Sequence, residues 1–241
     1  MSKMSPTHSP LQNYLLAALP SAEFKRISSH LELVPLPLGD ILYESGGKLN
    51  YLYFPTTAII SMLYVLDNGS SAEIAVVGNE GILGITLFMG CETTPSRAII
   101  QSAGYGYRLK STLLMAEYNR AQVLMTLLLR YTQALFKQMT QTAICNQNHT
   151  IDQQLCRWLL LSLDRLPLDS FTMPQELITN MLGVRRDGVS ESASKLQRDG
   201  SIKYSRGRIE VINRSGLEKN VCECYGVVKK EFERLYVDIK N

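Results

Sequence analysis

Apolar residues follow a helical period at both ends of this chain, and short strand-like runs lie between them. Leu11–Ile27 holds two short helical patterns that are separated at Pro20. From Leu31 to Lys110, apolar runs of strand length alternate with turn residues such as Asp67-Asn68-Gly69, a hairpin signal. These runs are Glu32–Leu36, Ile41–Tyr43, Tyr51–Phe54, Ala58–Leu66, Ala72–Val77, Ile82–Leu87, Arg97–Gln101 and Gly104–Leu109. Seven or eight short strands at this spacing predict an antiparallel β-roll of the jelly-roll type.

A long helical pattern without glycine or proline covers Arg120–Asn146, after a shorter one at Ser111–Tyr118. Two stripes run along it in steps of four and three residues, so the helix needs two partners. We predict that one partner is the roll and the other is the same helix of a second subunit; burial of both sides within one chain is the alternative. The stripe assigned to the dimer interface is Leu124, Leu128, Tyr131, Leu135, Gln138 and Thr142. The other stripe is Met125, Leu129, Thr132, Phe136, Met139 and Ala143.

The last third of the chain has the element order of a winged helix-turn-helix. A helix over Thr150–Leu166 and a hinge at Leu166–Phe171 lead into a short helix over Pro174–Leu182. Gly183 ends that helix, a second helix runs through Arg198, and two strand-like runs follow. Such a module inserts its second helix into the major groove of DNA.

The outward side of that second helix combines hydrogen-bond donors and acceptors, as the reading of base edges requires. Val189, Ala193 and Leu196 form its inner stripe. The residues predicted to contact base edges are Arg186, Asp187, Ser190 and Glu191. The residues predicted to contact phosphates, which hold register without reading sequence, are Arg185, Ser194, Lys203, Arg206 and Arg208. The alternative is a surface helix pair without a ligand.

A further amphipathic helix is expected over Leu217–Ile239, packed either on the winged module or on a partner subunit. Charge favours DNA binding by this part of the chain. The net charge is +3, from 25 basic and 22 acidic residues. Arg185–Arg214 alone holds 8 basic and 4 acidic residues, so the excess of positive charge lies around the predicted reading helix.

Composition places the chain among ordinary globular proteins, since 45% of its residues are hydrophobic. Met1–Pro10 is polar and lacks the apolar core of a signal peptide, and no apolar run reaches membrane-spanning length. Five cysteines are an odd number without a paired framework. These features predict a reduced, cytoplasmic protein that does not interact with a membrane.

The order of roll, long helix and winged helix resembles the Crp/Fnr superfamily of bacterial transcription regulators, from about Leu15 to Tyr225. The segments that carry the resemblance are Y-L-Y-F-P at Tyr51–Pro55, V-G-N-E-G-I-L-G at Val77–Gly84, T-A-I-C-N-Q-N-H at Thr142–His149, R-W-L-L at Arg157–Leu160 and L-G-V-R-R-D-G-V at Leu182–Val189.

The resemblance implies an α+β protein with a cyclic-nucleotide-binding-type sensing domain over residues 1–118 and a dimerisation helix over 119–148. Residues 149–241 would then form the DNA-binding domain. It also implies a homodimer on a pseudo-palindromic operator of double-stranded DNA, a small-molecule effector, and RNA polymerase as a further partner.

The nucleotide-binding positions depart from the family's cyclic-AMP-responsive members. Where those have Gly-Glu and Arg-Ser pairs, this chain has Gly84-Ile85 and Arg97-Ala98. Isoleucine cannot accept a hydrogen bond from ribose, so we expect an effector other than cyclic AMP. Arg97 either holds another anion or is a solvated strand residue. Thr140 completes the predicted effector pocket, and Gly188 replaces the family's usual Thr or Ser in the reading helix.

Two other classes of function are alternatives to DNA binding. Cys145 and His149, four residues apart, could form a redox or metal sensor, but two ligands are too few for a closed site. Cys222 and Cys224 would not share a helix face, so no metal site is expected there. No cysteine precedes Cys91, which argues against the iron–sulfur centre of oxygen-sensing members, and no cofactor is predicted. The sequence has no nucleophile motif, P-loop or zinc motif that indicates an enzyme.

Overall fold

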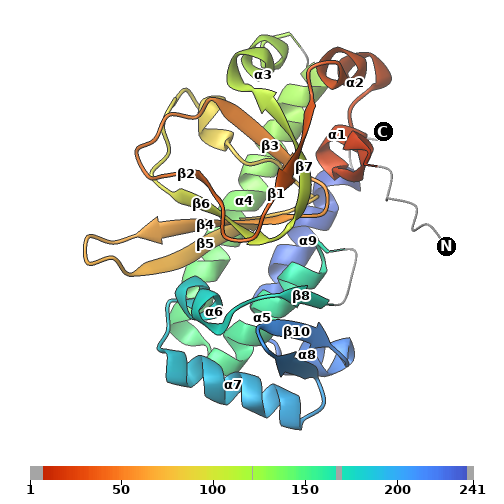
Figure 1. The fold of residues 1–241 in the computed structure, drawn as a ribbon. Helices are drawn as coiled ribbons and strands as arrows, with labels where there is room; N and C mark the ends of the chain where they lie inside the picture. Colours follow the sequence, from red (N-terminus) through yellow and green to blue (C-terminus); the bar gives the residue numbers. More distant parts are fainter. Residues whose placement is uncertain (1–7, 121, 167–169, 238–241) are drawn as a thin grey trace, which may run out of the picture.

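The computed structural model describes residues 8–120, 122–166 and 170–237, and it confirms the predicted α+β class (Figure 1). The roll occupies one end of the molecule and the small C-terminal domain the other, with a long helix running between them. Short N-terminal helices lie against the roll: η1 (Pro10–Gln12), α1 (Tyr14–Ala17) and α2 (Ser21–Ser28). Among the described residues, no helix combines the length and apolar character that membrane crossing requires.

The roll consists of two antiparallel sheets, ordered β1-β7-β3 and β2-β6-β4-β5. Its strands are β1 (Glu32–Leu36), β2 (Ile41–Tyr43), β3 (Tyr51–Pro55), β4 (Ile59–Val65), β5 (Ser71–Val77), β6 (Arg97–Ser102) and β7 (Gly104–Lys110). The predicted hairpin at Asp67-Asn68-Gly69 joins β4 to β5, with the Leu66 N–H donating to the Ser70 carbonyl at 2.8 Å. Figure 1 shows this hairpin projecting from the roll above the C-terminal domain.

The predicted strand at Ile82–Leu87 is wrong. Only Leu83 forms a bridge, to Tyr53, and Ile85–Leu87 is a 3₁₀ turn (η2). Gly84 has φ 113°, outside the extended range, so the backbone turns away after one bridge. The apolar run reflects burial on all sides rather than a strand, since Ile82, Leu83 and Ile85 are all in the core.

Helix α4 (Gln122–Asn148) follows α3 (Ser111–Tyr118) and passes beside the roll, and α5 (Ile151–Leu163) comes next. Thr150 and Gln153 form a capping box at the start of α5. The stripe assigned to the dimer interface is wrong, because it is buried within a single chain: Leu124, Leu128, Tyr131, Leu135, Gln138 and Thr142 are at most 8% exposed. Helix α4 contacts β5 of the roll and the last helix, α9 (Glu223–Val237). The exposed large apolar residues of α4 are Leu129, Phe136 and Ile144.

The described C-terminal part of the chain contains a three-stranded sheet of order β8-β10-β9, the three helices α6, α7 and α8 beside it, and the last helix, α9. Its elements are β8 (Ser170–Thr172), α6 (Gln175–Leu182), α7 (Arg186–Arg198), β9 (Ile202–Ser205), β10 (Arg208–Val211), α8 (Arg214–Asn220) and α9 (Glu223–Val237). The sequence analysis did not predict β8, which overlaps the end of the expected hinge and pairs with β10.

The prediction of a single helix over Leu217–Ile239 is also wrong, because the helical conformation is interrupted between α8 and α9. Val221 adopts an extended conformation (φ −77°, ψ 153°). Helix α9 packs against α4 instead of the winged module, with the rings of Tyr131 and Phe232 6.2 Å apart. Residues 238 and 239 of the expected helix lie outside the described part of the chain.

Candidate nucleic-acid interface

Helices α6 and α7 form a helix-turn-helix whose geometry matches the sequence prediction. Gly183 ends α6 with φ 65°, and its N–H donates to the Thr179 carbonyl at 3.0 Å. Val189, Ala193 and Leu196 are buried on the inner side of α7. The opposite side of α7 therefore faces solvent at the end of the molecule farthest from the roll (Figure 1).

The first two turns of α7 carry the predicted base-reading residues. Arg186, Asp187 and Glu191 are exposed and recur at helical spacing, so they share one face. Arg185 occupies the N-cap position and is also exposed. Ser190 is half-buried: its hydroxyl donates to the Arg186 carbonyl at 2.9 Å and accepts a hydrogen bond from Gln175. The structure thus groups the charged candidates on one surface and ties Ser190 to α6.

Gly188 lies on the side of α7 that faces α5. A Cβ at this position would lie 2.6 Å from Cδ1 of Ile151. A side chain at position 188 would therefore require the end of the Ile151 side chain to shift. The absence of a side chain lets α7 sit closely against α5.

The wing is the β9–β10 hairpin, whose two-residue turn is Arg206-Gly207. Arg206 has φ 50° and Gly207 has φ 75°, as a type I′ turn requires. Arg206 is the one non-glycine residue with positive φ in the described chain. The predicted phosphate contacts on the wing, Lys203, Arg206 and Arg208, are all exposed, and so is Ser194 on α7.

The roll contacts the helix-turn-helix directly through its β4–β5 hairpin. Ser61 on β4 donates to the Glu73 carboxylate at 2.6 Å, and its Oγ lies 2.9 Å from Sδ of Met181 on α6. Burial raises the pKa of Glu73 to about 7, and the hydrogen bond from Ser61 opposes that rise. Side chains of the roll and of α6 are therefore in direct contact.

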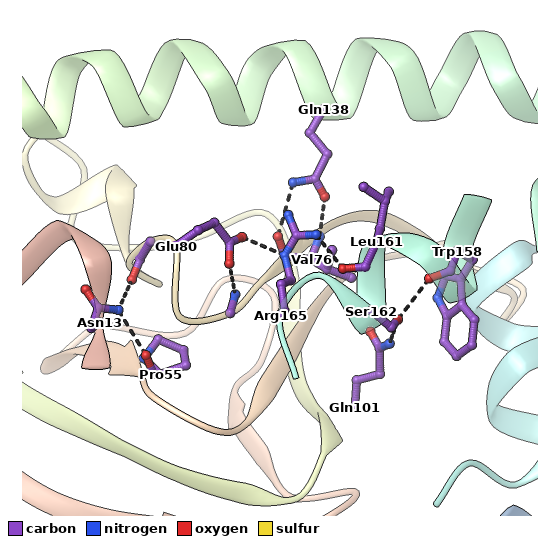
Figure 2. A network of polar contacts seen from close by, with 12 residues as sticks. Asn13, Pro55, Val76, Glu80, Gln101, Gln138, Trp158, Leu161, Ser162 and Arg165 are labelled. Atoms are coloured by element: carbon purple, nitrogen blue, oxygen red, sulfur yellow. Dashed lines mark hydrogen bonds and ion pairs between the residues drawn. The ribbon is translucent and has the colours of Figure 1, made fainter. Parts of the chain in front are cut away.

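A second set of polar contacts joins the roll to α4 and α5 (Figure 2). Gln138 pairs with the backbone of Val76, accepting its N–H at 2.8 Å and donating to its carbonyl at 3.1 Å. Arg165 donates from Nε to Oε1 of Glu80 at 2.7 Å, and both side chains are buried. Gln101 of β6 donates to the Ser162 hydroxyl at 3.0 Å. These contacts join the roll to the helices that precede the helix-turn-helix.

The residues predicted for the effector pocket lie in different environments. Ile85 and Ala98 are buried among apolar side chains. The Arg97 guanidinium pairs with Glu44 at 2.7 Å and is partly exposed. Thr140 is exposed on α4 and donates to the Phe136 carbonyl at 2.9 Å. The structure therefore shows no group at position 85 or 98 that could bind a ribose hydroxyl or a phosphate through its side chain.

Two features were missed from sequence. A cavity of about 300 Å³ opens between α1, α5 and α9, where Asp164, Arg165 and Lys229 contribute to its lining. No periodicity indicates it, because its walls come from four distant segments, including Asn79 and Glu80.

The second missed feature is a cluster of Cys145, His149, Cys222 and Cys224, whose candidate ligand atoms all lie within 4.8 Å of one another. The expectation of only two ligands is therefore wrong. It failed because the break between α8 and α9 leaves Cys222 outside the helix, so that it can approach the same point as Cys224.

Comparisons with known proteins agree with the architecture. The profile of a family described as the Crp-like helix-turn-helix domain matches residues 153–220. FixK2 from Bradyrhizobium japonicum has a similar structure, with a TM-score of 0.65 at 16% identity over 80% of this chain and 98% of that one.

Two further solved structures are similar. A candidate transcriptional regulator of the Crp/Fnr family from Eubacterium rectale gives a TM-score of 0.64 at 16% identity over 88% of this chain and 97% of that one. A CRP-family regulator from Thermus thermophilus gives 0.63 at 17% identity over 80% and 96%. No curated protein matches the sequence. At 16–17% identity, the similarity to solved structures shows the fold alone. The family match identifies residues 153–220 as similar to Crp-like helix-turn-helix domains.

Proposed function

We propose that this chain, whose residues 153–220 form a Crp-like helix-turn-helix domain within a Crp/Fnr-type fold, binds specific DNA operators through α7 and regulates transcription. The observation that carries the proposal is the exposed charged face of α7 beside a basic wing. Arg186, Asp187 and Glu191 offer donors and acceptors to base edges. Arg185, Lys203 and Arg206 are exposed, and we propose that they contact phosphates.

The proposal is tested by comparing two variants on a selected operator and on scrambled DNA. Arg186→Ala removes a proposed base contact. The variant should lose about 1–3 kcal/mol of binding free energy on the operator and much less on scrambled DNA. Lys203→Ala removes a phosphate contact and should weaken binding to both duplexes alike. Equal losses on both duplexes for Arg186→Ala would contradict the assignment of α7 as the reading helix.

We further propose that the active form is a homodimer paired through the exposed face of α4. Leu129 and Phe136 are seven residues apart and about half exposed, and Thr140 and Ala143 extend the same face. The seven-residue spacing favours α4 of a second copy as the partner of this face. In such a dimer the two copies of α7 would contact half-sites about 34 Å apart.

Sedimentation of the Leu129→Lys/Phe136→Lys variant tests the dimer. The wild type should sediment as a dimer and the variant as a monomer with weakened operator binding. Leu66→Lys, which changes an exposed apolar residue at the tip of the β4–β5 hairpin, is the matched control and should remain dimeric. A variant that stays dimeric would place the interface elsewhere.

The roll is proposed to sense an effector other than cyclic AMP and to pass the signal to α6. Buried Ile85 and Ala98 argue against cyclic AMP as the effector, because neither side chain can form hydrogen bonds with its ribose or phosphate. The contact of Ser61 and Glu73 with Met181 supports the route. Titration calorimetry with cyclic AMP should show no binding, and tight binding would contradict the proposal.

A further inference from the structure

Four side chains from two distant segments meet beside the junction of α4 and α5. Cys145 lies in the last turn of α4, and His149 follows the end of that helix. Cys222 and Cys224 flank the start of α9. Three of the four are thiols that are at most 5% exposed, and they form a cluster of their own, apart from the main hydrophobic core. Their association is therefore not a by-product of general core packing.

Two distances in the cluster match those between ligands of one tetrahedral metal ion, and all four candidate ligand atoms lie within 4.8 Å of one another. In a tetrahedral zinc site, bonds of about 2.3 Å to sulfur and about 2.1 Å to nitrogen place two sulfurs roughly 3.8 Å apart and a sulfur and a nitrogen roughly 3.5 Å apart. Here Sγ of Cys145 and Sγ of Cys222 are 3.6 Å apart. Sγ of Cys224 lies 3.5 Å from Nδ1 of His149. A disulfide would bring two sulfurs much closer, to about 2.05 Å.

The surroundings orient the ligands as metal sites require. Nε2 of His149 lies 3.3 Å from the Glu223 carboxylate, which leaves the Nδ1 lone pair directed at the thiols. Gln141 donates from Nε2 to Sγ of Cys224 at 3.1 Å. Gln154 donates to the His149 carbonyl at 2.9 Å and fixes the backbone of that ligand.

Charge also favours a metal–thiolate centre. One divalent ion with three thiolates and a neutral imidazole carries a net charge of −1. Cys222 and Cys224 stand at the N-terminus of α9, where the helix dipole stabilises negative charge. Arg157 is buried, interacts electrostatically with both Glu73 and Cys145, and donates to Thr142, one helical turn before Cys145. A negative centre would add to the negative charge near this guanidinium.

We propose that Cys145, His149, Cys222 and Cys224 bind one zinc ion in a closed structural site. Soft thiolates with one imidazole at tetrahedral spacing select zinc over oxygen-preferring cations. The ion fastens the start of α9 to the end of α4, next to the junction that leads into the DNA-binding domain. Four protein ligands leave no position for water or substrate, so the site stabilises the fold and is not catalytic. This proposal is independent of DNA binding.

Metal analysis of the full chain, purified without chelators, tests the proposal. We expect about one zinc ion per chain in the wild type and in two controls: Cys91→Ser, at an exposed thiol, and Cys156→Ser, at a buried thiol outside the cluster. Cys222→Ser/Cys224→Ser should lose the ion. Replacement by Co²⁺ should give the visible absorption of a tetrahedral thiolate site in the wild type and none in that double variant.

Glu223→Gln keeps all four ligands. It is included because the double cysteine variant could lose zinc simply by failing to fold. It should retain zinc but lose it to a competing chelator at about 10- to 100-fold lower chelator concentration. The proposal is overturned if the wild type binds neither zinc nor tetrahedral Co²⁺ after reduction and addition of metal. It is equally overturned if the metal content survives in the double cysteine variant, or if anaerobic protein holds an iron–sulfur chromophore on these cysteines.

Discussion

Single residues of the proposed DNA interface could be predicted because their roles follow from local rules. Gly183 ends α6 with positive φ, and the inner stripe of α7 is buried as its spacing requires. Ser190 could not be placed in the same way, since its hydroxyl is engaged by α6, a neighbour that periodicity does not specify. Arg206 is unusual because arginine occupies a turn position with positive φ, a conformation that favours Asn or Gly.

Arg206→Asn is expected to stabilise the protein and weaken its binding to DNA. Asparagine tolerates positive φ better than arginine, so the free energy of unfolding should rise by roughly 1 kcal/mol. Loss of the phosphate contact should reduce the dependence of log K on log salt concentration by about one. Urea unfolding and salt-dependent DNA binding measure the two effects. Lys203→Asn, at an ordinary strand position, should show only the binding loss; a destabilised Arg206→Asn would argue against strain.

Whole elements were predictable where their period was unbroken. The strands of the roll, the long helix and the helix-turn-helix appear within a few residues of their expected bounds. The errors fall where local backbone geometry overrides an apolar pattern, at Gly84 and at Val221. The packing side of α4 was also not predictable, because both stripes are apolar and the positions of the roll and α9 together decide which one is buried.

The contact between β5 and α6 predicts a pH-dependent stability. Burial raises the pKa of Glu73 to about 7 from its usual value near 4.5. The folded state then retains a proton that the unfolded state releases, so stability falls as pH rises through this window and stays lower above it. Glu73→Gln removes the penalty and should be more stable than the wild type at pH 8, by up to about 3 kcal/mol, with little difference near pH 4.5.

Urea unfolding of wild type and Glu73→Gln across pH 4.5 to 8 measures this difference. Glu210→Gln, at an exposed position on the wing, is the control and should follow the wild type at every pH. A constant difference between Glu73→Gln and the wild type would show that the proton is not held in the folded state.

At the scale of the whole molecule, the contacts that join the roll to the helices were beyond sequence reasoning. Gln138 looked like an interface residue from its spacing, yet it completes the hydrogen bonding of Val76 on β5. Glu80 lies within a segment that carries the family resemblance, but its partner Arg165 is 85 positions later in the chain. Only the folded chain brings such pairs together. Figure 2 shows both pairs where the roll meets the helices, a contact region called the seam below.

The buried pair of Glu80 and Arg165 should be strongly coupled in its effect on stability. Arg165→Met leaves the Glu80 carboxylate buried without its partner, which should cost about 3–5 kcal/mol. Glu80→Gln/Arg165→Met removes both charges and should recover most of that loss, because the remaining amide still accepts the Gly78 N–H. A double-mutant cycle by urea unfolding measures the coupling. Arg234 and Glu231, an exposed pair on α9, provide the control cycle and should give less than about 1 kcal/mol. Additive losses at Glu80 and Arg165 would mean that the seam is held by apolar packing alone.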